Sequence, residues 1–150
     1  MAGGWLCIGH RPRISYTGKF ARAGGTHVLT LLSEREGAGR IGAAVERNGL
    51  DWLWFPMESA AIPGDERIPE LLTLFRKLQI ALCAGGRVVI HCSAGLHRTG
   101  MVAHGLLHFL GLDDDEAMDV LVKLRPLTAE QAGDQRLAWG RRFGRTLDRP

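Results

Sequence analysis

Apolar residues gather in four short runs that predict β-strands. The runs lie at residues 5–8, 27–32, 50–55 and 88–90. Their length and their content of apolar and β-branched residues are typical of buried strands. Gly-His-Arg-Pro follows the first run, which indicates an edge strand that ends in a turn.

Between these runs, apolar residues recur at three- and four-residue spacings, the pattern of amphipathic helices. The strongest example spans residues 67–82, with Pro69 in its first turn and Gly85-Gly86 at its end. Similar patterns predict one helical turn within residues 20–25 and helices at residues 40–48, 101–110, 117–124 and 131–145. Residues 113–116 are acidic, and there we expect an N-cap with first-turn acids rather than a metal site.

Strands that alternate with amphipathic helices predict an α/β fold with a central, mostly parallel twisted sheet flanked by helices. The 150 residues suit one domain with one core, so we expect residues 1–150 to form a single domain. Ligands of such sheets bind at the carboxyl ends of the strands. The segment after residue 90 and the irregular loop at residues 57–65 are therefore the places to look for chemistry.

Composition supports a globular protein, with 45% hydrophobic and 23% charged residues. No apolar run approaches the ~20 residues that span a membrane, and the N-terminus lacks the pattern of a signal peptide. We therefore expect a cytoplasmic protein without membrane partners. The oligomeric state has no signature in the sequence.

The chain is mildly basic, with a net charge of +3, which suits an anionic substrate. Five arginines lie near its end, namely Arg136, Arg141, Arg142, Arg145 and Arg149. No nucleic-acid-binding motif accompanies them. We expect a solvated basic helix and tail rather than a nucleic-acid partner.

The three cysteines, Cys7, Cys83 and Cys92, are odd in number and far apart, which argues against a disulfide framework. Cys7 and Cys83 lie in apolar surroundings, where we expect them to be small core residues. A redox partnership of either with Cys92 is an open alternative that no sequence feature supports.

Cys92 stands where a strand gives way to a loop, and Arg98 stands where the next helix begins. A helix N-terminus attracts anions, and both a thiolate and a phosphate are anions. We therefore expect Cys92 to be a nucleophile that attacks a phosphomonoester and forms a cysteinyl-phosphate, which water then hydrolyses. Arg98 presents a planar fork that can hold two phosphate oxygens.

The loop residues and their neighbours have expected roles of their own. The backbone N–H groups of the phosphate-binding segment would form an anion nest, with Gly95 supplying conformational freedom. Thr99 can donate a hydrogen bond to the thiolate, and His91 would orient the loop from behind. The expected phosphate-binding residues are Ser93, Ala94, Gly95, Leu96, His97 and Arg98.

The stretch His91–Gly100 resembles the phosphate-binding loop of the protein tyrosine phosphatase superfamily, His-Cys-x-x-Gly-x-x-Arg-Thr-Gly. Residues 23–32 and Trp54-Phe55-Pro56 are similar to segments of the compact dual-specificity phosphatases, notably the cyclin-dependent kinase inhibitor 3 branch. The resemblance implies a cysteine phosphatase fold and metal-independent hydrolysis of phosphomonoesters, with phosphotyrosine and phosphoserine/threonine of proteins as substrates. It implies no cofactor.

The resemblance also raises the question of the proton donor. The family's aspartate, which follows the Phe-Pro pair, falls here on Ser59, and serine is a poor acid. The adjacent Glu58 is the first alternative, Asp65 is the second, and the third is that this loop holds no acid. Gln131, and after it Gln135, matches the glutamine that positions the hydrolytic water, although both also fit a solvated helix.

Two other functions remain in view. The serine at the acid position suggests a phosphate- or phosphoprotein-binding module with impaired catalysis. His104 and His108 lie four apart on a predicted helix, a spacing that can bind one metal ion. No third ligand is evident in the sequence, so we expect packed or solvated histidines and no metal.

Overall fold

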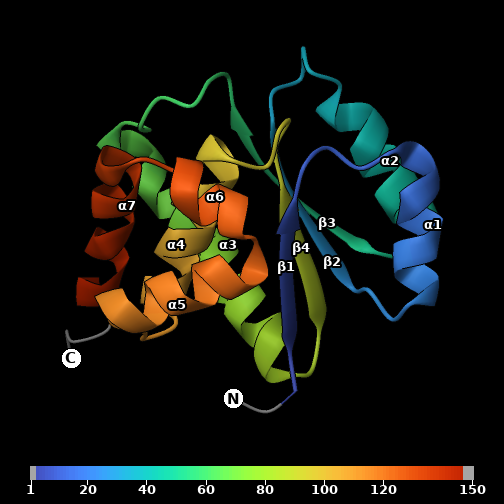
Figure 1. The fold of residues 1–150 in the computed structure, drawn as a ribbon. Helices are drawn as coiled ribbons and strands as arrows, with labels where there is room; N and C mark the ends of the chain where they lie inside the picture. The colour runs from blue at the N-terminus through green and yellow to red at the C-terminus, as the bar shows by residue number, and fades with distance from the viewer. Residues whose placement is uncertain (1–2, 147–150) are drawn as a thin grey trace.

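A four-stranded parallel sheet forms the centre of the molecule, as the sequence predicts (Figure 1). The computed structural model describes residues 3–146. The strand order is β1-β4-β2-β3 and every neighbouring pair is parallel. The strands are β1 (Trp5–Gly9), β2 (His27–Leu32), β3 (Asp51–Met57) and β4 (Arg87–His91). β1 is an edge strand, as expected.

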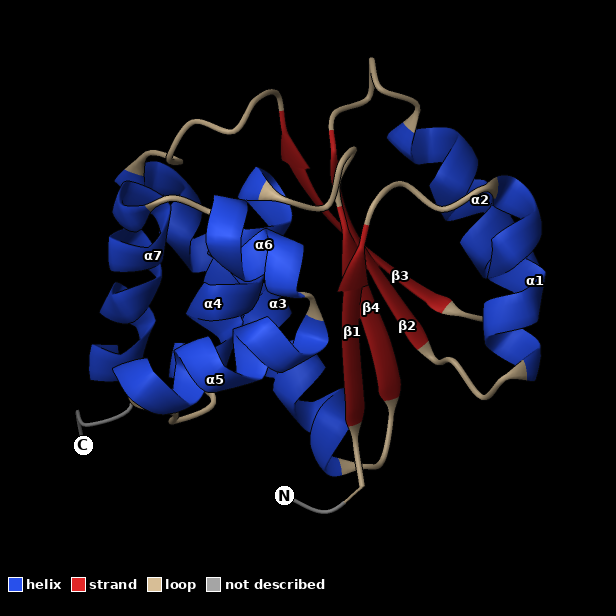
Figure 2. Cartoon of the chain, viewed as in Figure 1, coloured by secondary structure: helices blue, strands red, loops and turns tan. Residues whose placement is uncertain are grey.

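Helices cover both faces of the sheet (Figure 2). On one face lie α1 (Ile14–Arg22) and α2 (Ala38–Arg47). The other face carries α3 (Ile68–Cys83), α4 (His97–Phe109), α5 (Asp114–Leu124), α6 (Pro126–Gln131) and α7 (Asp134–Gly140). Two 3-10 helices complete the described chain, η1 (Asp65–Arg67) and η2 (Arg141–Thr146).

Helix α4 is the centre of the larger core. Every residue from Arg98 to Phe109 is buried, because α4 is surrounded by α5, α6, α7 and η2 as well as the sheet. The ring of Phe75 from α3 packs on the rings of Phe109 and Phe143, with centroids 5.6 and 5.1 Å away. A helix enclosed in this way gives its first turn a fixed position, and that turn carries Arg98.

The strand register brings three loops to one edge of the sheet. At the carboxyl end of β4, His91 pairs with Gly9 of β1 and with Thr30 of β2. The loops that follow β1, β2 and β4 therefore begin at the same level and lie side by side. This is the edge where parallel sheets bind ligands.

Three helix predictions need correction. α1 begins at Ile14, not near Phe20, and its only buried residue is Thr17. α4 begins at His97, four residues before the predicted start, because its polar first turn is buried at the functional edge. The predicted helix at residues 131–145 is interrupted at Gly133, whose φ is 91°. The short helix α6 was not predicted, whereas the other strands and α-helices match the prediction within a few residues.

The prediction that Cys7 and Cys83 belong to the core is wrong, since both are exposed. β1 has no neighbour on its outer side, and the alternation of its side chains buries Ile8 while Cys7 faces outward. The predicted cap of α5 is confirmed: Asp113 and Glu116 form a reciprocal capping box. No helix within residues 3–146 has the length and apolar content to cross a bilayer.

The basic residues near the end of the chain are largely engaged with the protein itself. Arg136 donates to the Ala60 carbonyl at 2.8 Å. Arg141 binds Asp114 and Arg142 binds Asp65, each at 3.0 Å. These bonds agree with the expected helix and tail rather than a nucleic-acid surface. Arg149 lies outside the described residues.

Candidate active site

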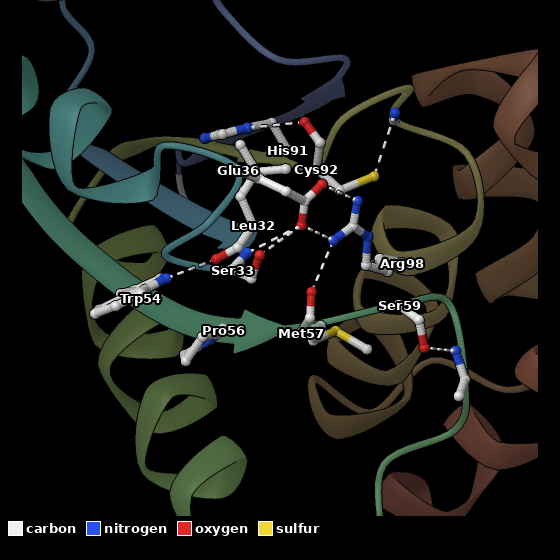
Figure 3. Close-up of polar contacts among 12 residues, drawn as sticks. Leu32, Ser33, Glu36, Trp54, Pro56, Met57, Ser59, His91, Cys92 and Arg98 are labelled. Atoms are coloured by element: carbon white, nitrogen blue, oxygen red, sulfur yellow. Dashed lines mark hydrogen bonds and ion pairs between the residues drawn. The ribbon is translucent and has the colours of Figure 1, made fainter.

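Cys92 lies at the start of the loop between β4 and α4, where the sequence predicts it (Figure 3). Its side chain is 3% exposed, and its Sγ accepts a hydrogen bond from the N–H of Gly95 at 3.2 Å. Gly95 has a φ of 73°, and a Cβ there would lie 2.3 Å from the carbonyl carbon of Gly9. Both the backbone conformation and the contact with β1 therefore require glycine at this position.

Two side chains from beyond α5 set the direction of the loop peptides. Arg125 Nη1 donates to the carbonyls of Ala94 and Gly95, at 2.9 and 3.0 Å. Thr128 Oγ1 donates to the Gly95 carbonyl at 2.6 Å. In a planar trans peptide the N–H points away from the C=O. The N–H groups of Gly95 and Leu96 therefore face the opposite side, and that of Gly95 reaches the thiol, an arrangement that supports the expected anion nest.

Arg98 is held by one end of its guanidinium group. Nη1 and Nη2 donate to the two carboxylate oxygens of Glu36, at 2.6 and 2.9 Å, and Nη1 also donates to the Met57 carbonyl at 2.7 Å (Figure 3). The Arg98 guanidinium also interacts with the side chain of Cys92. It therefore lies beside the thiol, where a guanidinium can offer parallel donors to two phosphate oxygens.

Glu36 is a site residue that sequence reasoning missed. Its Oε1 accepts from the backbone N–H and the hydroxyl of Ser33, both at 3.1 Å. The bond to Arg98 is the main cause that lowers the pKa of Glu36 to about 2, so the carboxylate stays charged. Its position in the loop after β2, at the same sheet edge as Cys92, was the signal that could have identified it.

His91 supports the loop from behind as a neutral ring. Nδ1 donates to the Cys92 carbonyl at 3.1 Å, which leaves Nε2 to accept from the hydroxyl of Thr30 at 2.8 Å. That hydroxyl in turn accepts from Trp52 Nε1 at 2.9 Å. Burial lowers the pKa of His91 to about 4. A buried, fully bonded imidazole of this kind supports the expected orienting role and not that of an acid.

The structure also locates three further residues for which the sequence predicts a role in the site, namely Thr99, Gln131 and Gln135. Thr99 Oγ1 is buried and has no hydrogen-bond partner in residues 3–146, so the expected bond to the thiolate is not formed in this state. Gln131, at the end of α6, and Gln135, in α7, are both exposed, and Gly133 separates their helices. Their role in positioning water stays a prediction.

The three candidates for the acid loop differ in their surroundings. Glu58 is exposed and directly follows Met57, whose carbonyl binds Arg98. The hydroxyl of Ser59 accepts from the N–H of Ala61 at 3.2 Å. Asp65 lies in η1, where its carboxylate pairs with Arg142. Glu58 is therefore the candidate carboxyl group that directly follows a residue bound to Arg98, and it has no ion-pair partner in the described structure.

Comparison with known proteins agrees with this geometry. The profile of a family described as "Tyrosine phosphatase family" matches residues 60–120. The tyrosine-protein phosphatase of Autographa californica nuclear polyhedrosis virus is 31% identical over 80 residues, which are 53% of this chain and 47% of the viral protein. The chain thus spans about half the length of this curated relative.

Solved structures match over almost the whole chain. Tk-PTP in its active form has a TM-score of 0.75 at 22% identity, over 97% of this chain and 95% of that one. Kinase associated phosphatase (KAP), with its catalytic cysteine replaced by serine, has a TM-score of 0.75 at 18% identity, over 95% and 85%. PTPMT1 in complex with PI(5)P has a TM-score of 0.76 at 16% identity, over 95% and 92%.

The chain is thus similar in sequence to tyrosine phosphatases over part of its length, and its fold is that of the solved protein tyrosine phosphatases. This is the cysteine phosphatase fold that the sequence resemblance implied. The family match covers the catalytic loop and α4, but of the acid-loop candidates it includes Asp65 and not Glu58 or Ser59. Glu36, Arg125 and Thr128 lie outside the matched residues, and their place in the site is known here from their contacts.

A group of potential metal ligands lies away from the loop around Cys92, on the last turns of α4 and the start of α5. The Nε2 atoms of His104 and His108 are 3.3 Å apart, and Asp114 Oδ1 is 3.2 Å from His108 Nε2. Asp114 is the third side chain that the sequence did not supply, because it belongs to α5. Arg141 Nε already donates to that oxygen at 3.0 Å, so a cationic group is in place there.

Replacing Glu36 with glutamine should show that it aligns Arg98. Removing a negative charge would by itself strengthen anion binding, whereas loss of alignment weakens it. We expect alignment to dominate, with about tenfold weaker binding of inorganic phosphate in calorimetric titration, as for the loss of one charged hydrogen bond. Glu34→Gln, an exposed neighbour, is the control and should bind phosphate like the parent protein. Unchanged or tighter binding in Glu36→Gln would contradict this role.

His91 should make folding sensitive to acid. Its folded-state pKa of about 4 lies below the usual 6.5, so the unfolded chain binds the proton first. Stability is therefore fully present above pH 6.5 and falls by up to about 3 kcal/mol as the pH drops to 4. Urea unfolding across this range should show a smaller decrease in His91→Asn than in the parent protein. His10→Gln, at an exposed position, should keep the parent's pH dependence.

Proposed function

We propose that this protein is a metal-independent, cysteine-dependent phosphatase that hydrolyses phosphotyrosine or phosphoserine/threonine of proteins through a cysteinyl-phosphate intermediate. The observation that carries the proposal is the catalytic loop itself. It directs the N–H of Gly95 toward the thiol of Cys92, and Glu36 aligns the guanidinium of Arg98 beside that thiol. Together they form a pocket for one phosphoryl group in front of a nucleophile.

In the first step, the thiolate of Cys92 attacks phosphorus. The S–P bond forms, the bond to the leaving oxygen breaks, and that oxygen takes a proton from the acid. The charge on the transferring phosphoryl group is spread over its equatorial oxygens. Arg98 and the loop N–H groups bind those oxygens, and Glu36 keeps the guanidinium in line.

In the second step, water attacks the phosphocysteine and the S–P bond breaks, so that the thiolate of Cys92 leaves. The N–H of Gly95 already donates to this sulfur. The hydroxyl of Thr99 has no partner among residues 3–146, so it can turn toward the sulfur as negative charge develops. We assign the positioning of the water to Gln131, as the resemblance implies.

We assign the proton donor to Glu58. Glu58 directly follows Met57, whose carbonyl binds Arg98, whereas Asp65 is engaged by Arg142, and this supports the assignment. A carboxylic acid speeds the departure of a poor leaving group by roughly 10² to 10⁴. Without such a donor, the protein would be the second candidate, a phosphoprotein-binding module with impaired catalysis.

Relatives named for their substrates inform the choice of substrate. The viral relative is a tyrosine-protein phosphatase, and KAP is a kinase associated phosphatase, which favours phosphoproteins. PTPMT1 has been solved with PI(5)P, so the same fold also accommodates a phosphoinositide. A panel of phosphopeptides and phosphoinositides therefore belongs in the first assay.

Hydrolysis of p-nitrophenyl phosphate tests the proposed function directly. We expect turnover that persists in chelator, is blocked by vanadate and is lost by at least 10³-fold in Cys92→Ser, as for removal of a covalent nucleophile. Cys83→Ser, at an exposed position outside the site, should keep parent activity. Full activity in Cys92→Ser would refute the mechanism. Phosphate binding without turnover in the parent protein would favour the binding module.

The dependence of rate on leaving group identifies the acid. Glu58→Gln should lose about 10²-fold in kcat/KM on a phosphotyrosine peptide but much less on p-nitrophenyl phosphate, whose leaving group needs no proton. The basic limb of the pH–rate profile should disappear in the same variant. Asp65→Asn and Ser59→Ala are the matched comparisons. The assignment moves to Asp65 if only its variant shows both effects.

A further inference from the structure

A groove of about 890 Å³ lies beside the catalytic loop, between the start of α1 and the exposed side of α2. These helices pack together on the face of the sheet opposite α4 (Figure 1). The groove adjoins the active site at two residues. Glu36 lines it and binds Arg98, and Arg11 lines it while its backbone N–H donates to the Ser93 carbonyl at 2.8 Å.

The groove is lined by five exposed arginines whose charge is not neutralised. None of them makes an ion pair or a side-chain hydrogen bond within residues 3–146, and the acidic residue of the lining, Glu36, is already bound to Arg98. Such a concentration of positive charge attracts anions and raises their local concentration. The five are Arg11, Arg13, Arg35, Arg40 and Arg47.

Arginines elsewhere in the described structure behave differently. Among the arginines whose side chains the structure describes, only Arg22 and Arg76 resemble the groove arginines in lacking side-chain hydrogen bonds. Seven others donate to carboxylates or carbonyls of the protein: Arg67, Arg87, Arg98, Arg125, Arg136, Arg141 and Arg142. Arginines without a partner are therefore concentrated in the groove, which points to a ligand and not to a generally basic surface.

The spacing of the charges favours an extended ligand. Arg40 and Arg47 are seven residues apart on α2, which corresponds to about 10 Å along the helix axis, and Arg11 lies at the catalytic loop. An extended peptide advances about 3.3 Å per residue. Three or four residues next to a phosphorylated residue in the active site would therefore reach along the groove, whereas a single compact headgroup would contact only part of it.

The chemistry of the lining selects among extended anions. Single-stranded nucleic acids are bound by stacking their bases on aromatic side chains. Apart from Glu36, which is bound to Arg98, the groove lining contains arginine, small and aliphatic residues and no aromatic side chain. Guanidinium groups instead match carboxylates, which they bind through two parallel hydrogen bonds.

We propose that the groove is a specificity subsite for acidic residues that flank the phosphorylated residue of a protein substrate. The inference rests on the proposed phosphatase function and adds its substrate class. The phosphoryl group occupies the catalytic loop, and glutamate or aspartate side chains lie along the arginines of the groove. The expected substrate is a phosphoprotein whose target site lies in an acidic stretch.

The test compares phosphotyrosine peptides of equal length, flanked on either side by four glutamates or by four alanines. We expect kcat/KM to be about tenfold higher for an acidic peptide at low ionic strength, because several exposed ion pairs contribute modestly each. The preference should shrink in 0.5 M salt, where such pairs are screened. The double variant Arg40→Ala/Arg47→Ala should lose most of it.

A charge-matched control separates the groove from net charge. The double variant Arg22→Ala/Arg76→Ala removes the same charge from exposed positions outside the groove lining, and it should keep the preference. Peptide binding to Cys92→Ser, followed by fluorescence anisotropy, tests the subsite without turnover. p-Nitrophenyl phosphate hydrolysis tests the proposed function separately, so that either can fail alone.

Three outcomes would overturn the subsite. The first is equal kcat/KM and equal binding for acidic and neutral peptides. The second is a preference that survives in Arg40→Ala/Arg47→Ala. The third is stronger competition by a 5′-phosphorylated oligonucleotide or by inositol hexakisphosphate than by the acidic peptide, abolished in the same variant, which would assign the groove to nucleic acid or to inositol phosphates.

Discussion

The pairing of Arg98 with Glu36 is the interaction on which the active site depends. Arg98 belongs to the first turn of α4, on one face of the sheet, and Glu36 belongs to the loop before α2, on the other (Figure 2). Their two hydrogen bonds cross the carboxyl edge of the sheet, and the Met57 carbonyl joins the acid loop to them. A partly buried pair of this kind contributes little net stability, because desolvation offsets its attraction. What it provides is alignment, since it fixes which edge of the guanidinium faces the substrate.

Hydrogen bonds from surrounding elements to its backbone carbonyls give the loop around Cys92 its conformation. Arg125 and Thr128 bind the carbonyls of Ala94 and Gly95, and the backbone of Arg11 binds that of Ser93. Each carbonyl turned outward leaves the next N–H turned inward. The anion nest is therefore a result of three elements that surround the loop, and a glycine at position 95 is required for them to approach so closely.

Features that depend on residues close together in the chain could be predicted from the sequence. The strands, the long helix α3 and the capping box at Asp113 follow from local pattern, and Cys92 and Arg98 follow from a motif in one contiguous stretch. Hydrogen-bond partners that are distant from each other in the chain could not be predicted. Glu36 lies 62 residues before Arg98 and Arg125 lies 30 residues after Gly95, and no local spacing marks either. The edge position of β1, which exposes Cys7, and the break at Gly133 are likewise set by tertiary packing and backbone geometry.

The distance in sequence between these partners also governs when the site can form. A chain emerging from the ribosome has Cys92 and Arg98 available long before residues 125–128, which orient the loop peptides. Contacts of large sequence separation carry a cost in chain entropy and form late. We therefore expect that Cys92 lies in a loop without its final conformation until residues 125–128 have been synthesised. We also expect the loop to bind anions only after the C-terminal helices have docked on α4. Phosphate, by binding the completed loop alone, would stabilise the finished fold over every earlier form.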